Sequence, residues 1–123
     1  MTGISGRGTN DSGKTWWPVR SFGFKGHCPY FLRHCNGTLL LAHRVPDTSL
    51  HWTSDDGKIW NGRVRFDSVG AAYPSMVELP DGLVYCVYYE EGKGSSIREI
   101  RLRVDQKGVA AGPWQPQGGG QMW

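Results

Sequence analysis

The sequence TNDSGKTW at residues 9–16 returns as TSDDGKIW at residues 53–60, an offset of 44 residues. Thr, Asp, Gly, Lys and Trp keep the same places in both copies. With the offset raised to 45, the turn dipeptide Asn36-Gly37 falls on Asp81-Gly82. The chain therefore contains an internal repeat, and a repeat of this length holds about four short strands, as in one blade of a β-propeller.

The turn dipeptides set the positions of the strands. Asn36-Gly37 and Asp81-Gly82 accept positive φ at both central positions of a two-residue hairpin, and each lies between apolar runs. Each dipeptide therefore joins a first strand to a second. We expect the strands of the first repeat at Tyr30–His34, Thr38–His43 and Ser49–Thr53, and those of the second at Ser75–Leu79, Leu83–Tyr89 and Ser96–Val104. A further strand is expected directly after each eight-residue motif, at Thr15–Arg20 and at Ile59–Phe66.

The composition agrees with an all-β chain. Among 123 residues there are 18 glycines, seven prolines and six tryptophans, and no segment keeps a helical apolar period, so we expect no helix longer than about two turns. We divide the chain into a propeller segment at 1–107 and a Gly/Pro-rich tail at 108–123, which reads as a loop. The propeller segment consists of a partial blade at 1–22, a full blade at 27–67 and a three-stranded blade at 72–104.

Charge and hydropathy restrict the partners. The net charge of +3 is spread along the chain, which argues against nucleic-acid and membrane-surface binding. No apolar run reaches the roughly 20 residues of a membrane span, and Met1–Gly8 lacks the apolar core of a signal peptide. We therefore expect a soluble chain, cytoplasmic as it stands, although the sequence does not identify its compartment.

The cysteines favour reduced thiols. Three cysteines leave one unpaired in any disulfide scheme, and Cys28 and Cys35 would lie roughly 23 Å apart along an extended strand. The pairs His27-Cys28 and His34-Cys35 match no compact zinc motif, because a strand would hold them far apart. We expect no metal and no cofactor.

The repeated motif predicts a turn held by its own carboxylate. Asp11 and Asp55 each stand two residues before a glycine, so each carboxylate can accept turn N–H groups while Gly13 or Gly57 takes positive φ. We expect these residues to be structural. The tryptophans that end the motifs, Trp16 and Trp60, are expected to begin strands and to pack between blades.

The first motif also fits the phosphate-binding pattern G-x-x-x-x-G-K-[ST], over Gly8–Thr15. A phosphate-binding loop runs into a helix, and Trp16-Trp17-Pro18-Val19 is unsuited to one. Asp11 would also lie inside the anion cradle, and the second copy has Ile59 in place of the Ser/Thr. We therefore interpret the motif as a turn and not as a nucleotide site.

The two motifs resemble the Asp box, S/T-x-D-x-G-x-T-W, of the BNR-repeat β-propellers that include the sialidases. Residues 72–82, AYPSMVELPDG, and residues 87–91, VYYEE, look like the last blade of sialidase-like proteins. The resemblance covers nearly all of Thr9 to Val104 and implies about two four-stranded blades. Asp boxes also occur on non-catalytic propellers, so the resemblance is more specific for fold than for activity.

Sialidases, as the resemblance implies, grip a sugar carboxylate with three arginines and use a tyrosine nucleophile, a supporting glutamate and an aspartate acid/base. Tyr73 matches the nucleophile, with Glu90 as its candidate partner, although Pro74 follows where catalytic members often have Ser. The blades that would hold the first arginine and the aspartate are absent from this chain. The family's ligand face adds the candidate contacts His27, His43, Arg44, Tyr89 and Glu91.

Three functions stay open. The first is a module that binds a sialic-acid-type or related glycan without a complete catalytic site. The second is an exo-sialidase-like hydrolase whose site is completed by other chains or by a missing N-terminal region, and the third is a structural assembly unit. Because Ser96–Val104 would lack a fourth strand, we expect Thr15–Arg20 of a second copy to supply it, most simply in a homotrimer that closes six blades.

Overall fold

The computed structural model describes residues 3–44, 47–65, 71–90 and 96–112, and within these ranges the chain is all-β. No helix long and apolar enough to cross a membrane occurs in them. The expectation of an all-β chain is confirmed. The strands are β1 (Gly3–Gly6), β2 (Arg20–Lys25), β3 (His27–Arg33), β4 (Leu39–Arg44), β5 (Thr48–Thr53), β6 (Asn61–Arg65), β7 (Ala71–Glu78), β8 (Val84–Glu90), β9 (Ile97–Asp105) and β10 (Gly108–Ala111).

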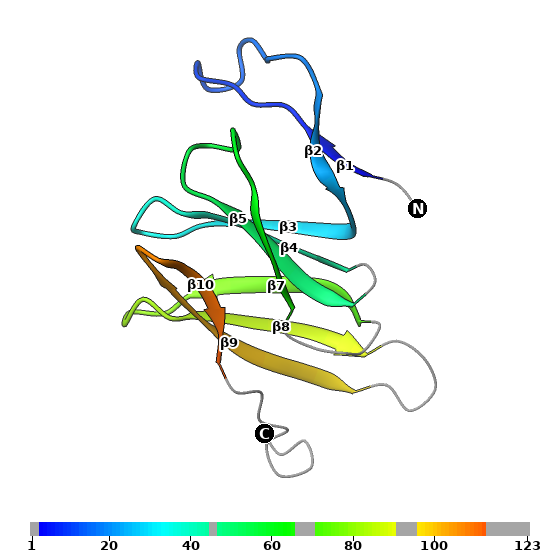
Figure 1. Ribbon diagram of the computed structural model, residues 1–123, viewed down its shortest axis with the longest axis vertical. Helices are drawn as coiled ribbons and strands as arrows, with labels where there is room; N and C mark the ends of the chain where they lie inside the picture. Colours follow the sequence, from blue (N-terminus) through cyan, green and yellow to red (C-terminus); the bar gives the residue numbers. More distant parts are fainter. Residues whose placement is uncertain (1–2, 45–46, 66–70, 91–95, 113–123) are drawn as a thin grey trace.

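The strands form three antiparallel sheets in which sequence neighbours pair. β3-β4-β5-β6 and β10-β9-β8-β7 are four-stranded, and β1-β2 is a two-stranded hairpin. Figure 1 shows the hairpin above the sheet β3–β6, with the sheet β7–β10 below it. The central sheet is therefore covered on both faces.

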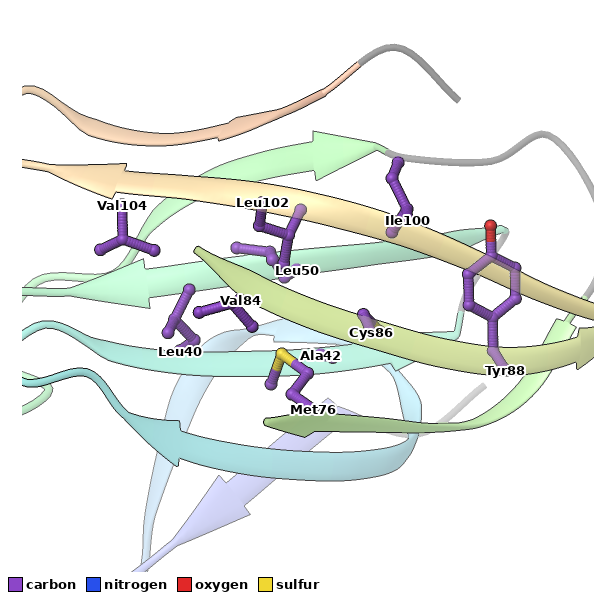
Figure 2. Packing of buried hydrophobic residues seen from close by; sticks show 10 residues of the cluster. All are labelled: Leu40, Ala42, Leu50, Met76, Val84, Cys86, Tyr88, Ile100, Leu102 and Val104. Atoms are coloured by element: carbon purple, nitrogen blue, oxygen red, sulfur yellow. The ribbon is translucent and has the colours of Figure 1, made fainter. Parts of the chain in front are cut away.

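The main core lies between the two four-stranded sheets (Figure 2). Leu40 and Ala42 of β4 face Val84 and Cys86 of β8, and all four are fully buried. Burying a large aliphatic side chain stabilises the fold by about 1.5–3 kcal/mol relative to leaving it exposed. The rest of the buried cluster consists of Leu50, Met76, Tyr88, Ile100, Leu102 and Val104.

The opposite face of the central sheet packs against the hairpin through aromatic rings. Phe24 stacks on His51 with ring centroids 3.7 Å apart and an interplanar angle of 6°. Phe22 lies 5.1 Å from the Trp60 ring, and Ile4 of β1 is buried. This second interface explains why Leu41, which points away from the main core, is also fully buried.

The repeated motifs fold as predicted, into turns held by their own side chains. The Asp11 carboxylate accepts the Thr15 N–H at 2.9 Å, and the Thr9 hydroxyl accepts the Gly13 N–H at 3.1 Å. The second turn repeats both bonds, from Ile59 N–H to Asp55 at 3.0 Å and from Gly57 N–H to Thr53 at 3.0 Å. Gly13 has φ 86° and Gly57 has φ 85°, as the turn requires. Because Asp11 occupies the Thr15 N–H and hydroxyl, the chain fills its own anion cradle.

The strand predicted at Thr15–Arg20 is wrong, because β2 begins only at Arg20. Trp16 and Trp17 lie in the preceding loop with 52% and 53% of their surface exposed. The Trp17 N–H donates to Gly8 O at 2.8 Å and closes that loop, and Pro18 has no N–H for a strand ladder. Trp16 therefore starts no strand, whereas Trp60 immediately precedes β6 and joins the aromatic interface.

The chain also supplies the fourth strand that was expected to be missing. β10 pairs with β9, with Val109 opposite Val104 and Ala111 opposite Leu102. The loop predicted from residue 108 is therefore wrong at its start, and the rest of the predicted tail, residues 113–123, lies outside the described residues. Because Ser96–Val104 already has its neighbour, strand exchange with a second copy is not needed to complete this sheet.

We predict that Asp55→Ala lowers the midpoint of thermal unfolding by more than Asp11→Ala does. The Asp55 turn joins β5 to β6 inside the central sheet, whereas the Asp11 turn joins only the two strands of the hairpin. Asp56→Asn is the control, because it keeps a residue tolerant of the positive φ while removing the neighbouring charge. Equal midpoints for Asp55→Ala and Asp56→Asn would contradict a structural role for the carboxylate.

Candidate functional site

The strands of the stacked sheets begin and end along two opposite sides of the molecule, here called its two edges, and these edges differ in chemistry. The Asp-box turns and the hairpin turns at Asn36-Gly37 and Asp81-Gly82 lie at one edge (Figure 1). The opposite edge, here called the site edge, contains the starts of β3, β5, β7 and β9 and the ends of β4, β6 and β8. Most residues that the sequence indicated for ligand contact belong to the site edge.

Tyr73 is the most exposed aromatic residue among those that the structure describes at the site edge, with 66% of its surface accessible. It lies on a bulge of β7, with φ 53°, directly before Pro74. A bulky residue at positive φ is uncommon, and bulges of this kind re-aim side chains next to functional sites. Its ring stacks on that of Tyr89, with centroids 6.2 Å apart and an interplanar angle of 22°.

The same bulge occurs in the central sheet. Cys28 has φ 56°, precedes Pro29 and interrupts the register of β3 with β4. Cys28 and Tyr73 are 45 residues apart, so the internal repeat extends to the backbone of this edge. The bulge is a property of the repeat, and the exposed tyrosine is specific to the second copy.

Glu90 is held by basic and hydroxyl side chains. Arg98 Nη2 lies 3.3 Å from Glu90 Oε1, and the Ser96 hydroxyl donates to the same oxygen at 3.4 Å. The Glu90 N–H donates to Ser96 O at 2.9 Å, which fixes the end of β8 against the start of β9. Glu91, another predicted contact, lies outside the described residues.

A second acidic–basic group at this edge was not predicted from the sequence. Asp47 is buried, and its two carboxylate oxygens contact Arg63 Nη1 at 3.0 Å and Arg65 Nε at 2.7 Å. The Arg-x-Arg spacing on β6 places both arginines on one face of a strand, which is the signal that the sequence offered. One carboxylate between two guanidinium groups leaves a net positive charge.

His43 is placed differently from the prediction. It is fully buried, because it lies on the face of β4 that the hairpin covers, where its Nε2 is 2.8 Å from His51 Nδ1. Burial, together with the nearby His51 and Arg63, lowers the pKa of His43 to about 4. Burial and Arg63 also lower the pKa of His51. His43 is therefore an interface residue and not a ligand contact.

The remaining predicted contacts lie where the sequence placed them. His27 begins β3 and pairs with Arg44 at the end of β4, so both are at the site edge. Both side chains are half-buried. Among the described residues of this edge, the cations Arg44, Arg63, Arg65 and Arg98 outnumber the acidic Asp47 and Glu90.

A cleft of about 950 Å³ opens at the opposite edge, between the hairpin and the central sheet. Its charged groups are largely engaged with neighbouring chain atoms, since Arg20 Nη2 donates to Gly57 O at 2.6 Å and Arg33 Nη1 donates to Asp56 at 3.0 Å. Asp55 in its wall is occupied by its own turn. We therefore place the candidate site at the site edge.

No protein-family model, curated protein or solved structure matches this chain. The functional argument therefore depends on the groups at the site edge. A pair of stacked aromatic rings can cover the apolar face of a ring-shaped ligand, and guanidinium groups can form paired hydrogen bonds with an anion. Both chemistries occur at the site edge, the aromatic pair on the sheet β7–β10 and the arginines Arg63 and Arg65 on the central sheet.

We predict that stability falls as the pH is lowered from about 6.5 to about 4, because the pKa of folded His43 is about 4 and its ordinary value is 6.5. In that pH window His43 becomes protonated in the unfolded chain but stays neutral in the folded chain, which lowers the free energy of unfolding by up to about 3 kcal/mol. Above the window this contribution is fully present. Urea unfolding at stepped pH measures it.

His43→Gln should flatten the pH dependence in this window, and His27→Gln at the site edge should leave it unchanged. The Asp11 carboxylate becomes protonated only at a lower pH, because its hydrogen bonds to Thr15 lower its pKa from 3.8 to about 2. An unchanged slope in His43→Gln would show that the buried imidazole does not control this acid transition.

Proposed function

We propose that this chain is part of a sialidase-like β-propeller that binds carbohydrate at the site edge, without a complete catalytic site of its own. The stacked pair of the exposed Tyr73 and the half-buried Tyr89 is the observation that carries the proposal. Two four-stranded meanders whose hairpin turns lie 45 residues apart support the propeller assignment, with one Asp-box turn in the hairpin β1–β2 and another in the central sheet.

The basic groups of the site edge indicate the ligand class. Arg63 and Arg65 of β6 share the Asp47 carboxylate, and Arg44 ends β4, on the far side of β5 in the same sheet. Guanidinium groups recognise carboxylates by paired hydrogen bonds. We therefore favour an acidic sugar of the sialic-acid type over a neutral one.

Binding is favoured over hydrolysis by the environment of Glu90. Hydrolysis by a tyrosine nucleophile needs a supporting carboxylate and a positioned proton donor. Glu90 is engaged by Arg98 and Ser96, and Pro74 follows Tyr73 where catalytic members of the resembled family often have Ser. An exo-sialidase-like hydrolase with a site completed by other chains is the alternative, and a purely structural assembly unit is the second alternative.

Binding is tested by titrating the chain with 3′-sialyllactose and with lactose, followed by saturation-transfer NMR. We expect sialyllactose to bind and Tyr73→Ala to weaken it at least about tenfold, or about 1.4 kcal/mol, because the stacking surface is lost. Trp17→Ala is the matched control, since Trp17 is exposed to a comparable degree at the opposite edge. Equal loss in both variants, or no binding by the unmodified chain, would overturn the proposal.

Hydrolysis is measured separately, with a fluorogenic sialoside and Tyr73→Phe. Under the binding proposal neither the unmodified chain nor the variant releases the fluorophore, and Tyr73→Phe keeps most of the affinity because the ring is retained. Release by the unmodified chain that Tyr73→Phe abolishes would establish the hydrolase alternative. Retention of structure with neither binding nor release would leave the assembly unit.

The proposal includes self-association as a trimer. Val77, Tyr85 and Val87 lie on the outward face of the sheet β7–β10, and their repeat equivalents Leu32, Leu40 and Ala42 face that same sheet from the central sheet. The outward face is thus built at positions that bury against a neighbouring sheet elsewhere in the chain.

We predict a mass of three chains by light scattering at micromolar concentration, from head-to-tail stacking of sheets in a closed ring. Val77→Lys should reduce the mass, because Val77 is exposed and its replacement places a charge in the sheet-to-sheet contact. Ile59→Lys, at an exposed position of the second Asp-box turn and away from that face, is the control for added charge. A monodisperse monomer of the unmodified chain would contradict the prediction.

A further inference from the structure

We propose that His34, Cys35 and Glu78 form a binding site for a Zn²⁺-class divalent metal ion. One ligand atom from each of the three residues lies within 4.8 Å of the other two. His34 and Cys35 lie where β3 enters its hairpin turn, and Glu78 ends β7 in the neighbouring sheet. The site is independent of the proposed glycan site, since it lies at the opposite edge of the sheets.

The fold brings these residues together from positions far apart in sequence. The Cys35 N–H donates to Glu78 Oε1 at 2.9 Å across a separation of 43 residues. Glu78 Oε2 lies 3.7 Å from His34 Nε2. The contact between the two sheets therefore gathers the carboxylate, the thiol and the imidazole.

The imidazole is held by hydrogen bonds at both ring nitrogens, and Nδ1 is the nitrogen beside the Cys35 thiol. His34 is only 4% exposed, and its Nε2 donates to Gly82 O at 2.8 Å. Metal-binding histidines commonly donate their second ring N–H to a backbone carbonyl in this way, which leaves the other nitrogen for the metal. Cys35 Sγ lies 3.8 Å from His34 Nδ1.

The spacing is close to that of a tetrahedral site. With metal–sulfur and metal–nitrogen bonds of about 2.3 and 2.0 Å, the two ligand atoms lie about 3.5 Å apart around zinc. The exposed Cys35 thiol needs only a small side-chain rotation to reach that distance. His34 Nδ1 accepts the Asn36 N–H at 3.1 Å, and the metal takes the place of that donor.

The ligand set selects the metal. A thiolate and an imidazole favour Zn²⁺ and its spectroscopic substitute Co²⁺ over Mg²⁺ and Ca²⁺, which prefer oxygen ligands. A cysteine binds a metal ion as the thiolate, so the thiol proton of Cys35 has to leave when the metal binds. Metal binding forms the metal–sulfur bond and releases that proton to solvent, and water completes the coordination on the exposed side.

The test is titration of the full chain with Co²⁺ alone, in the presence of a phosphine reductant. We expect saturation at one equivalent, a sulfur-to-cobalt charge-transfer band in the near ultraviolet, and release of one proton per metal. Zn²⁺ should abolish the cobalt bands by competition. Absence of the charge-transfer band in the unmodified chain would overturn the proposal.

Cys35→Ser should remove the charge-transfer band, whereas Cys28→Ser is the matched control and should keep it, since Cys28 lies at the opposite end of the same strand. Glu78→Gln should weaken Co²⁺ binding at least about tenfold. Circular dichroism checks that each variant is folded. A band that survives Cys35→Ser, or that Cys28→Ser removes, would place the metal elsewhere and overturn the assignment.

Discussion

Strand β4 of the central sheet is buried on both faces, and the rest of the structure depends on covering it. The strand reads Leu39-Leu40-Leu41-Ala42, without the alternation of a sheet that has one face in water. The sheet β7–β10 buries one face with aliphatic residues, and the hairpin β1–β2 buries the other with aromatic rings. Both the sheet β7–β10 and the hairpin β1–β2 are required, because removing either would expose fully buried leucines to water.

Stacking of this kind leaves the edges of the sheets for chemistry. At one edge the Asp-box turns consume their carboxylates and hydroxyls in internal hydrogen bonds. At the other edge the chain bends through bulges at Cys28 and Tyr73, which turn side chains outward. One edge is structural because the polar groups of its turns hydrogen-bond to one another, and the other edge is the candidate site.

The strands bounded by strong turn signals could be predicted from the sequence, and the ones without them could not. Asn36-Gly37 and Asp81-Gly82 located β3, β4, β7 and β8 to within a few residues. β10 was missed because Gly108–Ala111 is a short run beside a Gly/Pro-rich segment, and it is a strand through packing of Val109 on the core. Tyr73 and Arg44 were predicted from the family resemblance, whereas Asp47 with its two arginines and Glu78 with His34 are tertiary contacts that local patterns do not encode.

The buried histidines connect the hairpin interface to the site edge. His43 and His51 share one short contact beneath Phe24, and the positive charge of Arg63 is one cause of their low pKa values. Arg63 also forms an ion pair with Asp47, so the same guanidinium lies near the buried histidines and within the acidic–basic group of the site edge. An anion bound at Arg63 would offset that positive charge, and the cost of protonating the histidines would fall. Under the proposed function, an acidic sugar bound at Arg63 would therefore affect the interface that keeps the hairpin in place.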